Sequence, residues 1–329
     1  MSTSTATRPI RPGLTEPYAV RVALTVIALA FLVAFLFVPF VFIFVEALRN
    51  GWAAYVDAIR APEALSAIWL TILVAALSVP TNAVFGIAAA WAITRFDFRG
   101  KRLLTTLIDL PFAVSPVVAG LIFVQLFGRQ GWFGPWLSSH DIKVIFAVPG
   151  IVLATIFVSF PFVARELIAV MEASGREEEE AAGLLGANGW QMFRRVTLPN
   201  VKWALFSGVI LCTARAMGEF GAVSVVSGRI RGETATMPIH VEILYNEYAF
   251  QASFAVASLL ALFAVFTLVM HTVAARRTRP VVVASSEAIV DEEPRARATA
   301  SSPDERSGAT GPRDRDSWGS GGRSPRIRQ

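Results

Sequence analysis

Six long runs of apolar residues constrain this chain more than any other feature of its sequence. A hydrocarbon core about 30 Å thick is crossed by roughly 20 apolar residues in a helix. The runs that reach this length are Val22–Val45, Leu65–Thr94, Leu103–Phe127, Val144–Ala164, Trp203–Val226 and Tyr248–Met270. Because a backbone in lipid must satisfy its own hydrogen bonds, each run is predicted to be a transmembrane helix. The fold class is therefore an all-α, polytopic membrane protein.

Composition agrees with a membrane protein and argues against several other classes. Of the 329 residues, 54% are hydrophobic and only 17% are charged, which is unusually apolar for a soluble domain. The net charge of +5 does not indicate a nucleic-acid partner, because the basic residues lie beside the apolar runs. A single cysteine excludes an intrachain disulfide, and the three histidines have no metal-ligand spacing. No metal site is predicted.

Lysine and arginine residues predict the orientation. They gather before the first run, after the second and after the sixth, and these sides are expected to be cytoplasmic. Residues 1–21 are then a cytoplasmic leader, and the first run is too long for a cleaved signal peptide. Residues 22–275 form the membrane domain, with a cytoplasmic loop at about 165–202. Residues 276–329, rich in Pro, Ser, Gly and alternating charges, are expected to be a disordered cytoplasmic tail. The location is the cell membrane.

The loop at about 165–202 carries a polar, gapped pattern between two apolar runs. Four consecutive glutamates at 177–180 suit the start of a helix, and three glycines then interrupt an apolar set. Two short helices that meet at a glycine bend are expected, and Pro199 is expected to end the loop. An amphipathic helix that rests on lipid is the alternative, but anionic headgroups would repel four glutamates. The pattern consists of Glu180, Ala181, Ala182, Gly186, Val196, Leu198 and Pro199.

This spacing resembles the signature loop of ABC-importer permeases, E-A-A-x3-G-x9-I-x-L-P, with Val196 where the family usually has Ile. Three further segments are similar to sulfate/thiosulfate permeases of the CysW type, and with the loop the resemblance covers roughly residues 20–275. These segments are Ile108–Gly120, Ala214–Ala222 and Val241–Tyr248. The resemblance implies a six-helix permease of the type I, MetI-like fold.

The same resemblance implies partners. The loop would dock on an ATP-hydrolysing subunit and transmit its closure to the membrane helices. Two ABC ATPase subunits, a homologous permease subunit (a heterodimer being expected) and an extracytoplasmic sulfate-binding protein would complete the importer. The chain has no G-x4-G-K-[ST] phosphate loop and neither of two common hydrolase motifs. It is therefore expected to be a transport subunit that is not itself an enzyme and binds no cofactor, while the partner uses ATP and Mg.

Ionisable and small residues inside the apolar runs are candidates for the substrate pathway. Arg215 is expected to lie deep in the membrane, where an ionisable group must be paired or face a cavity, and Glu219 shares its helix face four residues on. Gly218 and Gly221 would allow close backbone approach. This group is either a positive element along an anion path or a self-neutralising ion pair.

The third run contains a second candidate group. Asp109 lies before Pro111, and Ser115 lies before Pro116. Prolines free backbone groups, and broken helices often line transport sites. A structural or gating role is favoured for Asp109, because a carboxylate repels a divalent anion. Asn82 is expected to hydrogen-bond between helices.

Two other functions remain open from the sequence. Molybdate or tungstate is the nearest alternative cargo, because related permeases share a segment like Gly218–Ala222 and these anions resemble sulfate in shape and charge. A stand-alone secondary transporter belongs to a different class, and the hydropathy pattern shows no inverted repeat in its favour.

Overall fold

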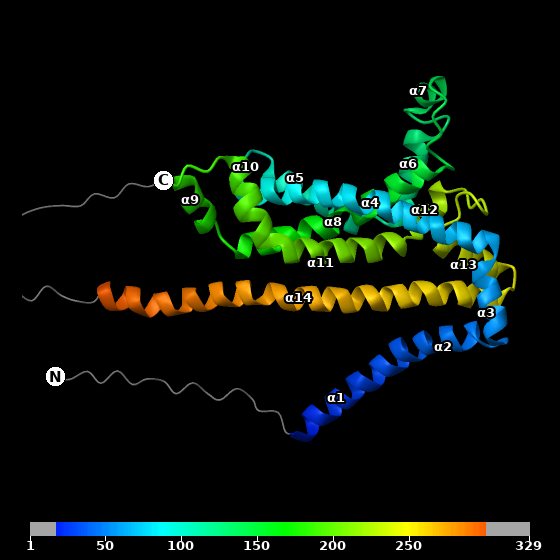
Figure 1. Cartoon of the computed structure of the whole chain (residues 1–329), viewed down its shortest axis with the longest axis horizontal. Coiled ribbons are helices and arrows are strands. Elements are labelled where there is room, and N and C mark those ends of the chain that lie inside the picture. The colour runs from blue at the N-terminus through cyan, green and yellow to red at the C-terminus, as the bar shows by residue number, and fades with distance from the viewer. Residues whose placement is uncertain (1–17, 301–329) are drawn as a thin grey trace, which may run out of the picture. The chain divides into compact units, whose positions relative to one another are not determined.

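A computed structural model describes residues 18–300, with side chains described as far as Arg276. Figure 1 shows these residues as an assembly of helices. The helix contacts described below lie in the first of two compact units of the chain, which ends at Ser285. The helices before residue 148 are α1 (Tyr18–Leu32), the π-helix η1 (Val33–Phe37), α2 (Val38–Ala47), α3 (Gly51–Arg60), α4 (Pro62–Arg95), α5 (Lys101–Ala113), α6 (Pro116–Phe127) and α7 (Gly134–Ser139). The later ones are α8 (Val148–Ala173), α9 (Glu177–Leu184), α10 (Gly189–Met192), the π-helix η2 (Phe193–Thr197), α11 (Leu198–Met217), α12 (Gly221–Val226), α13 (Met237–Asn246) and α14 (Phe250–Ala300).

The all-helical fold with membrane-spanning helices is confirmed. Among the described residues, five continuous helical stretches are long and apolar enough to cross a membrane: Tyr18–Ala47, Pro62–Arg95, Val148–Ala173, Gly189–Met217 and Phe250–Arg276. A sixth span is obtained if the bent pair α5 and α6 is counted as one. The helices begin and end a few residues away from the predicted runs, because their capping turns contain polar residues that the hydropathy pattern leaves out.

Two predicted boundaries need comment. α1 begins at Tyr18 and so includes the end of the expected leader, whose residues 1–17 lie outside the described part of the chain. The tail expected from residue 276 is helical as far as Ala300, as the end of α14, where Ala, Glu and Arg are good helix formers. Residues 301–329 also lie outside the described part.

Small residues allow α4, α8 and α11 to pack closely in the main core. A Cβ atom on Gly86 of α4 would lie 2.8 Å from Val163 Cγ1 of α8, and one on Gly208 of α11 would lie 3.2 Å from Val163 Cα. Val163 is fully buried between the two glycines. In a membrane, helices associate through such close van der Waals packing. These three helices therefore form the rigid centre of the subunit.

A buried polar contact joins the same three helices, as predicted for Asn82. Asn82 Nδ2 donates a hydrogen bond to Ser159 Oγ over 2.9 Å and lies 3.6 Å from Cys212 Sγ. All three side chains are buried. An interhelical hydrogen bond in this setting fixes the register of the helices as well as their distance.

The two ends of the helical assembly carry different short elements. α9 and α10 lie at the end where α5 begins, whereas α3 and α13 lie at the opposite end (Figure 1). α1 has no buried residue, so its apolar surface is available to lipid. The end of α2 contacts α14, where Gln251 Nε2 donates to the Ala47 carbonyl over 3.0 Å.

Candidate functional site

The predicted loop folds into a compact knob, which we define as residues 174–197. Its first helix, α9, has all four glutamates of the 177–180 run in its first turn, where the helix dipole favours negative charge. Gly175 and Gly186 flank this helix with φ angles of +68° and +85°. These left-handed conformations are accessible to glycine with little strain. The motif position Gly186 therefore has a backbone reason for being glycine.

The second half of the knob departs from the expectation for Pro199. A capping box begins α10, since Asn188 Oδ1 accepts from the Gln191 N–H over 2.8 Å and Gln191 Oε1 accepts from the Asn188 N–H. From there the chain stays helical to Met217. Pro199 does not end a loop but lies in the first turn of α11. The π-helix η2, in which the Leu198 N–H bonds to the Phe193 carbonyl, shifts the hydrogen bonding just ahead of the proline.

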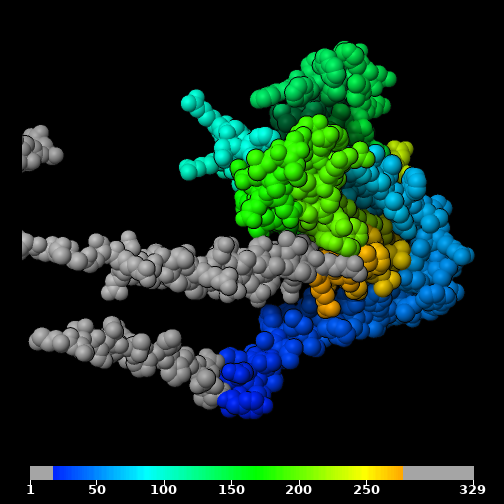
Figure 2. Space-filling model, turned by 60° about the vertical axis from the view of Figure 1, so that its left-hand side comes forward, coloured from blue at the N-terminus to red at the C-terminus, as the bar shows by residue number. Residues whose placement is uncertain are grey.

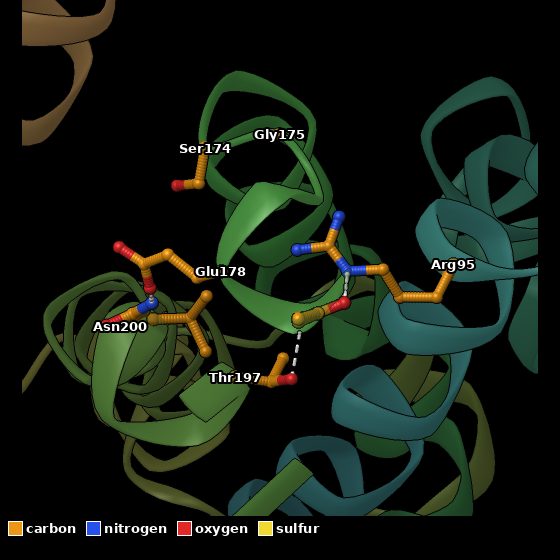
Figure 3. A pocket seen from close by; sticks show the side chains of 8 residues that line it. Arg95, Ser174, Gly175, Glu178, Thr197 and Asn200 are labelled. Carbon is orange, nitrogen blue, oxygen red and sulfur yellow. Dashed lines mark hydrogen bonds and ion pairs between the residues drawn. The ribbon is translucent and has the colours of Figure 1, made fainter. Parts of the chain in front are cut away.

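A buried ion pair fastens the knob to the bundle. Arg95, the last residue of α4, has its Nε 2.7 Å from Glu179 Oε2, and each of these side chains is 10% exposed. Thr197 Oγ1 donates to the other carboxylate oxygen of Glu179 over 2.6 Å. One carboxylate thus joins α9, η2 and α4. We call Arg95, Glu179 and Thr197 the clasp; Figure 3 labels Arg95 and Thr197 and marks the contact of each with a dashed line.

Further hydrogen bonds surround the clasp. Arg176 donates to the Thr94 carbonyl over 2.7 Å, and Arg95 donates to the Met171 carbonyl over 3.2 Å. Asn200 Nδ2 donates to Glu178 Oε2 (Figure 3). A cavity of about 20 Å³, lined by the clasp together with Ser174, Gly175, Glu178, Asn200 and Val201, is large enough for one water molecule. The base of the knob is therefore polar, hydrogen-bonded and closely packed.

The outer surface of the knob carries exposed apolar side chains. Leu184 and Leu185 are 91% and 90% exposed, and Trp190 is 67% exposed. Figure 2 shows this bright green segment at the surface, beside the cyan start of α5. Two adjacent leucines next to a row of carboxylates form a surface with both apolar and anionic parts. Such a surface is typical of a docking site for another protein.

The motif residues divide between these two surfaces. Glu180, Ala181 and Pro199 are exposed, whereas Ala182, Val196 and Leu198 are half-buried. The buried carboxylate is Glu179, which precedes the motif and was not singled out from the sequence. In the sequence, Arg95 counts only as one of the basic residues after the second apolar run, which predict orientation. No local pattern indicates that it would contact Glu179.

Two of the predicted spans are broken. The third run bends by 107° between α5 and α6, because Val114 and Ser115 are extended ahead of Pro116. The fifth run stops at Met217 and resumes as the short helix α12 at Gly221. Neither run is the single straight helix that the hydropathy pattern predicts, since apolar content does not report a backbone break.

The broken segments pack on each other with very little space. A Cβ atom on Gly221 of α12 would lie 2.8 Å from Pro116 Cβ of α6. One on Gly120 of α6 would lie 2.8 Å from the Ala222 carbonyl oxygen. The structure thus brings the predicted residue Gly221 next to the bend that contains Ser115. Irregular backbone of this kind occurs at membrane depth only inside protein or beside a water-filled cavity.

The expected pairing of Arg215 with Glu219 is confirmed. Arg215 Nη1 forms an ion pair with Glu219 Oε2, and Glu219 Oε1 accepts the Ala222 N–H over 2.9 Å. The Glu219 side chain is 2% exposed and that of Arg215 is 31% exposed. Glu219 therefore stabilises the start of α12 at the break, with Gly218 next to it in the chain.

Asp109 lies apart from this group and has a partner that sequence reasoning missed. Arg165 Nε lies 2.7 Å from Asp109 Oδ1. The sequence places Arg165 at the beginning of the cytoplasmic loop, whereas the structure places it inside α8. The two residues are 56 positions apart, so no local pattern could have joined them. The pair connects α5 with α8.

The end of the bundle opposite the knob is also rich in ion pairs. Arg231 bridges Glu63 and Glu247, and Arg229 pairs with Glu242 over 3.2 Å. Burial lowers the pKa of His240 in α13 below its ordinary value, because desolvation disfavours the charged imidazolium. Among the described residues, no group of three His, Cys, Asp or Glu side chains is arranged to hold a metal ion.

Comparisons with known proteins agree with these features. The model of a family described as "Binding-protein-dependent transport system inner membrane component" matches residues 82–280. The sulfate transport system permease protein CysW of Escherichia coli (strain K12) is 54% identical over 237 residues, which are 72% of this chain and 81% of that protein. The sulfate transport system permease protein CysT of the same strain is 39% identical over 247 residues, covering 73% of this chain and 89% of that protein.

A solved structure shares the fold. The crystal structure of a bacterial alginate ABC transporter in complex with an alginate pentasaccharide-bound periplasmic protein contains a chain that aligns with a TM-score of 0.64 at 19% sequence identity. The alignment covers 80% of this chain and 95% of that one. With the family match across the knob and both broken helices, the conclusion is that this chain belongs to the family of inner-membrane components of binding-protein-dependent transport systems, as a multi-pass permease and not an ATPase.

Proposed function

We propose that this chain is the permease subunit of an ATP-driven importer that carries sulfate or thiosulfate across the cytoplasmic membrane. The observation that carries the proposal is the similarity to the CysW protein over most of that protein's length. The family membership supports an importer supplied by a separate binding protein. The choice of sulfate as the anion rests on the similarity to CysW. The mechanism is proposed from the clasp, the knob and the broken helices.

In this proposal the knob receives the work of ATP hydrolysis. An ATPase subunit docks on Leu184, Leu185 and Trp190, which are exposed, and on the neighbouring Glu180 of the motif. Movement of the docked knob passes through the clasp to the end of α4, since the buried ion pair and its hydrogen bonds resist separation. ATP and Mg belong to the partner. The knob and both termini then face the cytoplasm.

The remaining partners are proposed from the comparisons and from the geometry. The similarity to both CysW and CysT favours a heterodimer with a homologous permease, together with two ATPase subunits. An extracytoplasmic sulfate-binding protein would deliver the anion to the opposite end, which is rich in ion pairs. The anion path runs past the broken helices, with Ser115, Arg215, Gly218, Glu219 and Gly221 near the contact of α6 with α12, and Asp109 further along α5.

Uptake of radiolabelled sulfate in a strain that lacks this gene tests the function. We expect uptake to be lost in the deletion strain and restored by the intact chain, with thiosulfate competing strongly and molybdate weakly. Full sulfate uptake in the deletion strain would contradict the assignment. Stronger competition by molybdate or tungstate than by thiosulfate would move the assignment to those anions, which have similar shape and charge.

A further inference from the structure

The Asp109–Arg165 pair joins α5 and α8, which both belong to candidate membrane spans. Asp109 is eight residues past the start of α5, and Arg165 is eight residues before the end of α8. At about 1.5 Å per residue, each lies about 12 Å from its helix end. These helix ends are on the side of the knob, so the pair lies toward that end of the two helices.

Contacts fix the plane of the Arg165 guanidinium group. Its Nε is bound to Asp109, and its central carbon lies 4.8 Å from the centre of the Phe112 ring. Phe112 in turn packs edge-on against Phe162, with 5.4 Å between ring centres. Among the described residues, no hydrogen bond involves Arg165 Nη1 or Nη2. Asp109 therefore holds the Nε edge of the guanidinium, and Phe112 covers one face. The terminal edge, Nη1 and Nη2, is free to bind another group.

The surroundings of this pair differ from those of Arg215. The Arg165 side chain is 55% exposed and that of Asp109 is 37% exposed, whereas Glu219 is almost fully buried and also holds a backbone N–H. Separating Arg215 from Glu219 would leave a buried carboxylate without its cation. Separating Arg165 from Asp109 leaves a carboxylate that is already 37% exposed. Arg165 is thus the cation that can exchange partners at low cost.

Charged side chains exposed on a spanning helix do not face lipid, because the cost is several kcal/mol or more. They face a water-filled path or a protein partner. The terminal edge of an arginine carries two parallel N–H groups that match two oxygens of a tetrahedral oxyanion. From these observations we propose that Arg165 contacts the transported oxyanion in the cytoplasmic half of the path.

Asp109 has two roles in this proposal. It positions the guanidinium through Nε, and its negative charge weakens the hold on a divalent anion, which favours release toward the cytoplasm. Arg165 binds the anion directly, while Asp109 acts through Arg165. The inference rests on the proposed function, because it requires that an oxyanion is the cargo.

The experiment measures KM and maximal rate of sulfate uptake, ATPase activity and subunit content of the assembled importer. For Arg165→Gln we expect uptake to fall about tenfold or more, the equivalent of one charge-assisted hydrogen bond, with the complex and its basal ATPase activity retained. Asp109→Asn keeps an acceptor for Nε, so we expect a lower KM and slower turnover. Arg102→Gln is the control for loss of an arginine charge, because Arg102 is exposed on α5, the helix of Asp109, and makes no side-chain contact among the described residues.

The charge exchange Asp109→Arg with Arg165→Asp separates this proposal from a purely structural ion pair. A structural pair would regain wild-type uptake in the exchanged variant, whereas an anion contact would not, because a carboxylate would stand at position 165. Wild-type uptake by Arg165→Gln, rescue by the exchange, or loss of the partner permease from the Arg165→Gln complex would each overturn the inference. Failure of the intact chain to transport sulfate would instead overturn the proposed function.

Discussion

Replacement of Glu179 by alanine is expected to detach the knob and abolish transport. The change leaves Arg95, whose side chain is 10% exposed, without its counter-charge, and removes the acceptor for Thr197. Removal of one partner from a buried ion pair costs about 3–5 kcal/mol, because the remaining charge stays desolvated. Thermal denaturation of the purified complex, measured together with sulfate uptake, checks both parts of the prediction.

Two further variants make this prediction specific to the clasp. Glu177→Ala removes a carboxylate from the same turn, but Glu177 is exposed and has no ion pair among the described residues, so stability should hardly change. Replacing Arg95 and Glu179 together with Met and Leu should recover most of the lost stability, since no unpaired charge remains. If Glu179→Ala were as stable and active as Glu177→Ala, the clasp would not connect the knob to α4.

The second large effect is expected at the contact between the broken helices. In Gly120→Val, the new Cβ would lie 2.8 Å from the Ala222 carbonyl oxygen and 2.9 Å from Val225 Cβ. The first neighbour is backbone, which cannot turn away as a flexible side chain would. Overpacking of this kind costs about 1–3 kcal/mol and forces the helices apart. We expect lower thermal stability of the complex and a large loss of sulfate uptake.

The partner position and a control complete this test. Gly221→Val meets the rigid ring of Pro116 at 2.8 Å and should have a similar effect from the other helix. Ala264→Val adds comparable bulk to the exposed surface of α14 and should leave stability nearly unchanged. Full stability and uptake in both glycine variants would show that α6 and α12 can separate without consequence.

The sequence predicts the helices well because a helix that crosses the bilayer needs an apolar run as long as the hydrocarbon core is thick. It also predicts contacts within one helix, as for Arg215 and Glu219, since a spacing of four residues places side chains on one face. Asn82 was predicted to hydrogen-bond between helices, although its partner, Ser159, could not be identified.

What the sequence did not predict depends on distant contacts or on backbone breaks. Glu179 with Arg95 and Asp109 with Arg165 are joined only by packing between helices. Proline was a clear signal with two outcomes: at Pro116 the chain bends, while at Pro199 a π-helix keeps it helical. Local residue preferences alone do not distinguish these two cases. The packing of neighbouring helices decides whether the chain bends or stays helical at a proline.

ATP-driven transport by the purified complex in proteoliposomes tests the central claim most directly. Sulfate uptake would be compared between the intact chain and Leu184→Gln with Leu185→Gln, whose parent side chains are about nine-tenths exposed and contribute little to the fold. An impermeant maleimide on a Leu184→Cys variant would report the side on which the knob lies, since Cys212 is buried. We predict uptake that requires ATP on the side of the knob and is lost in the double variant. Uptake that followed an imposed ion gradient without ATP or an ATPase subunit would contradict the account.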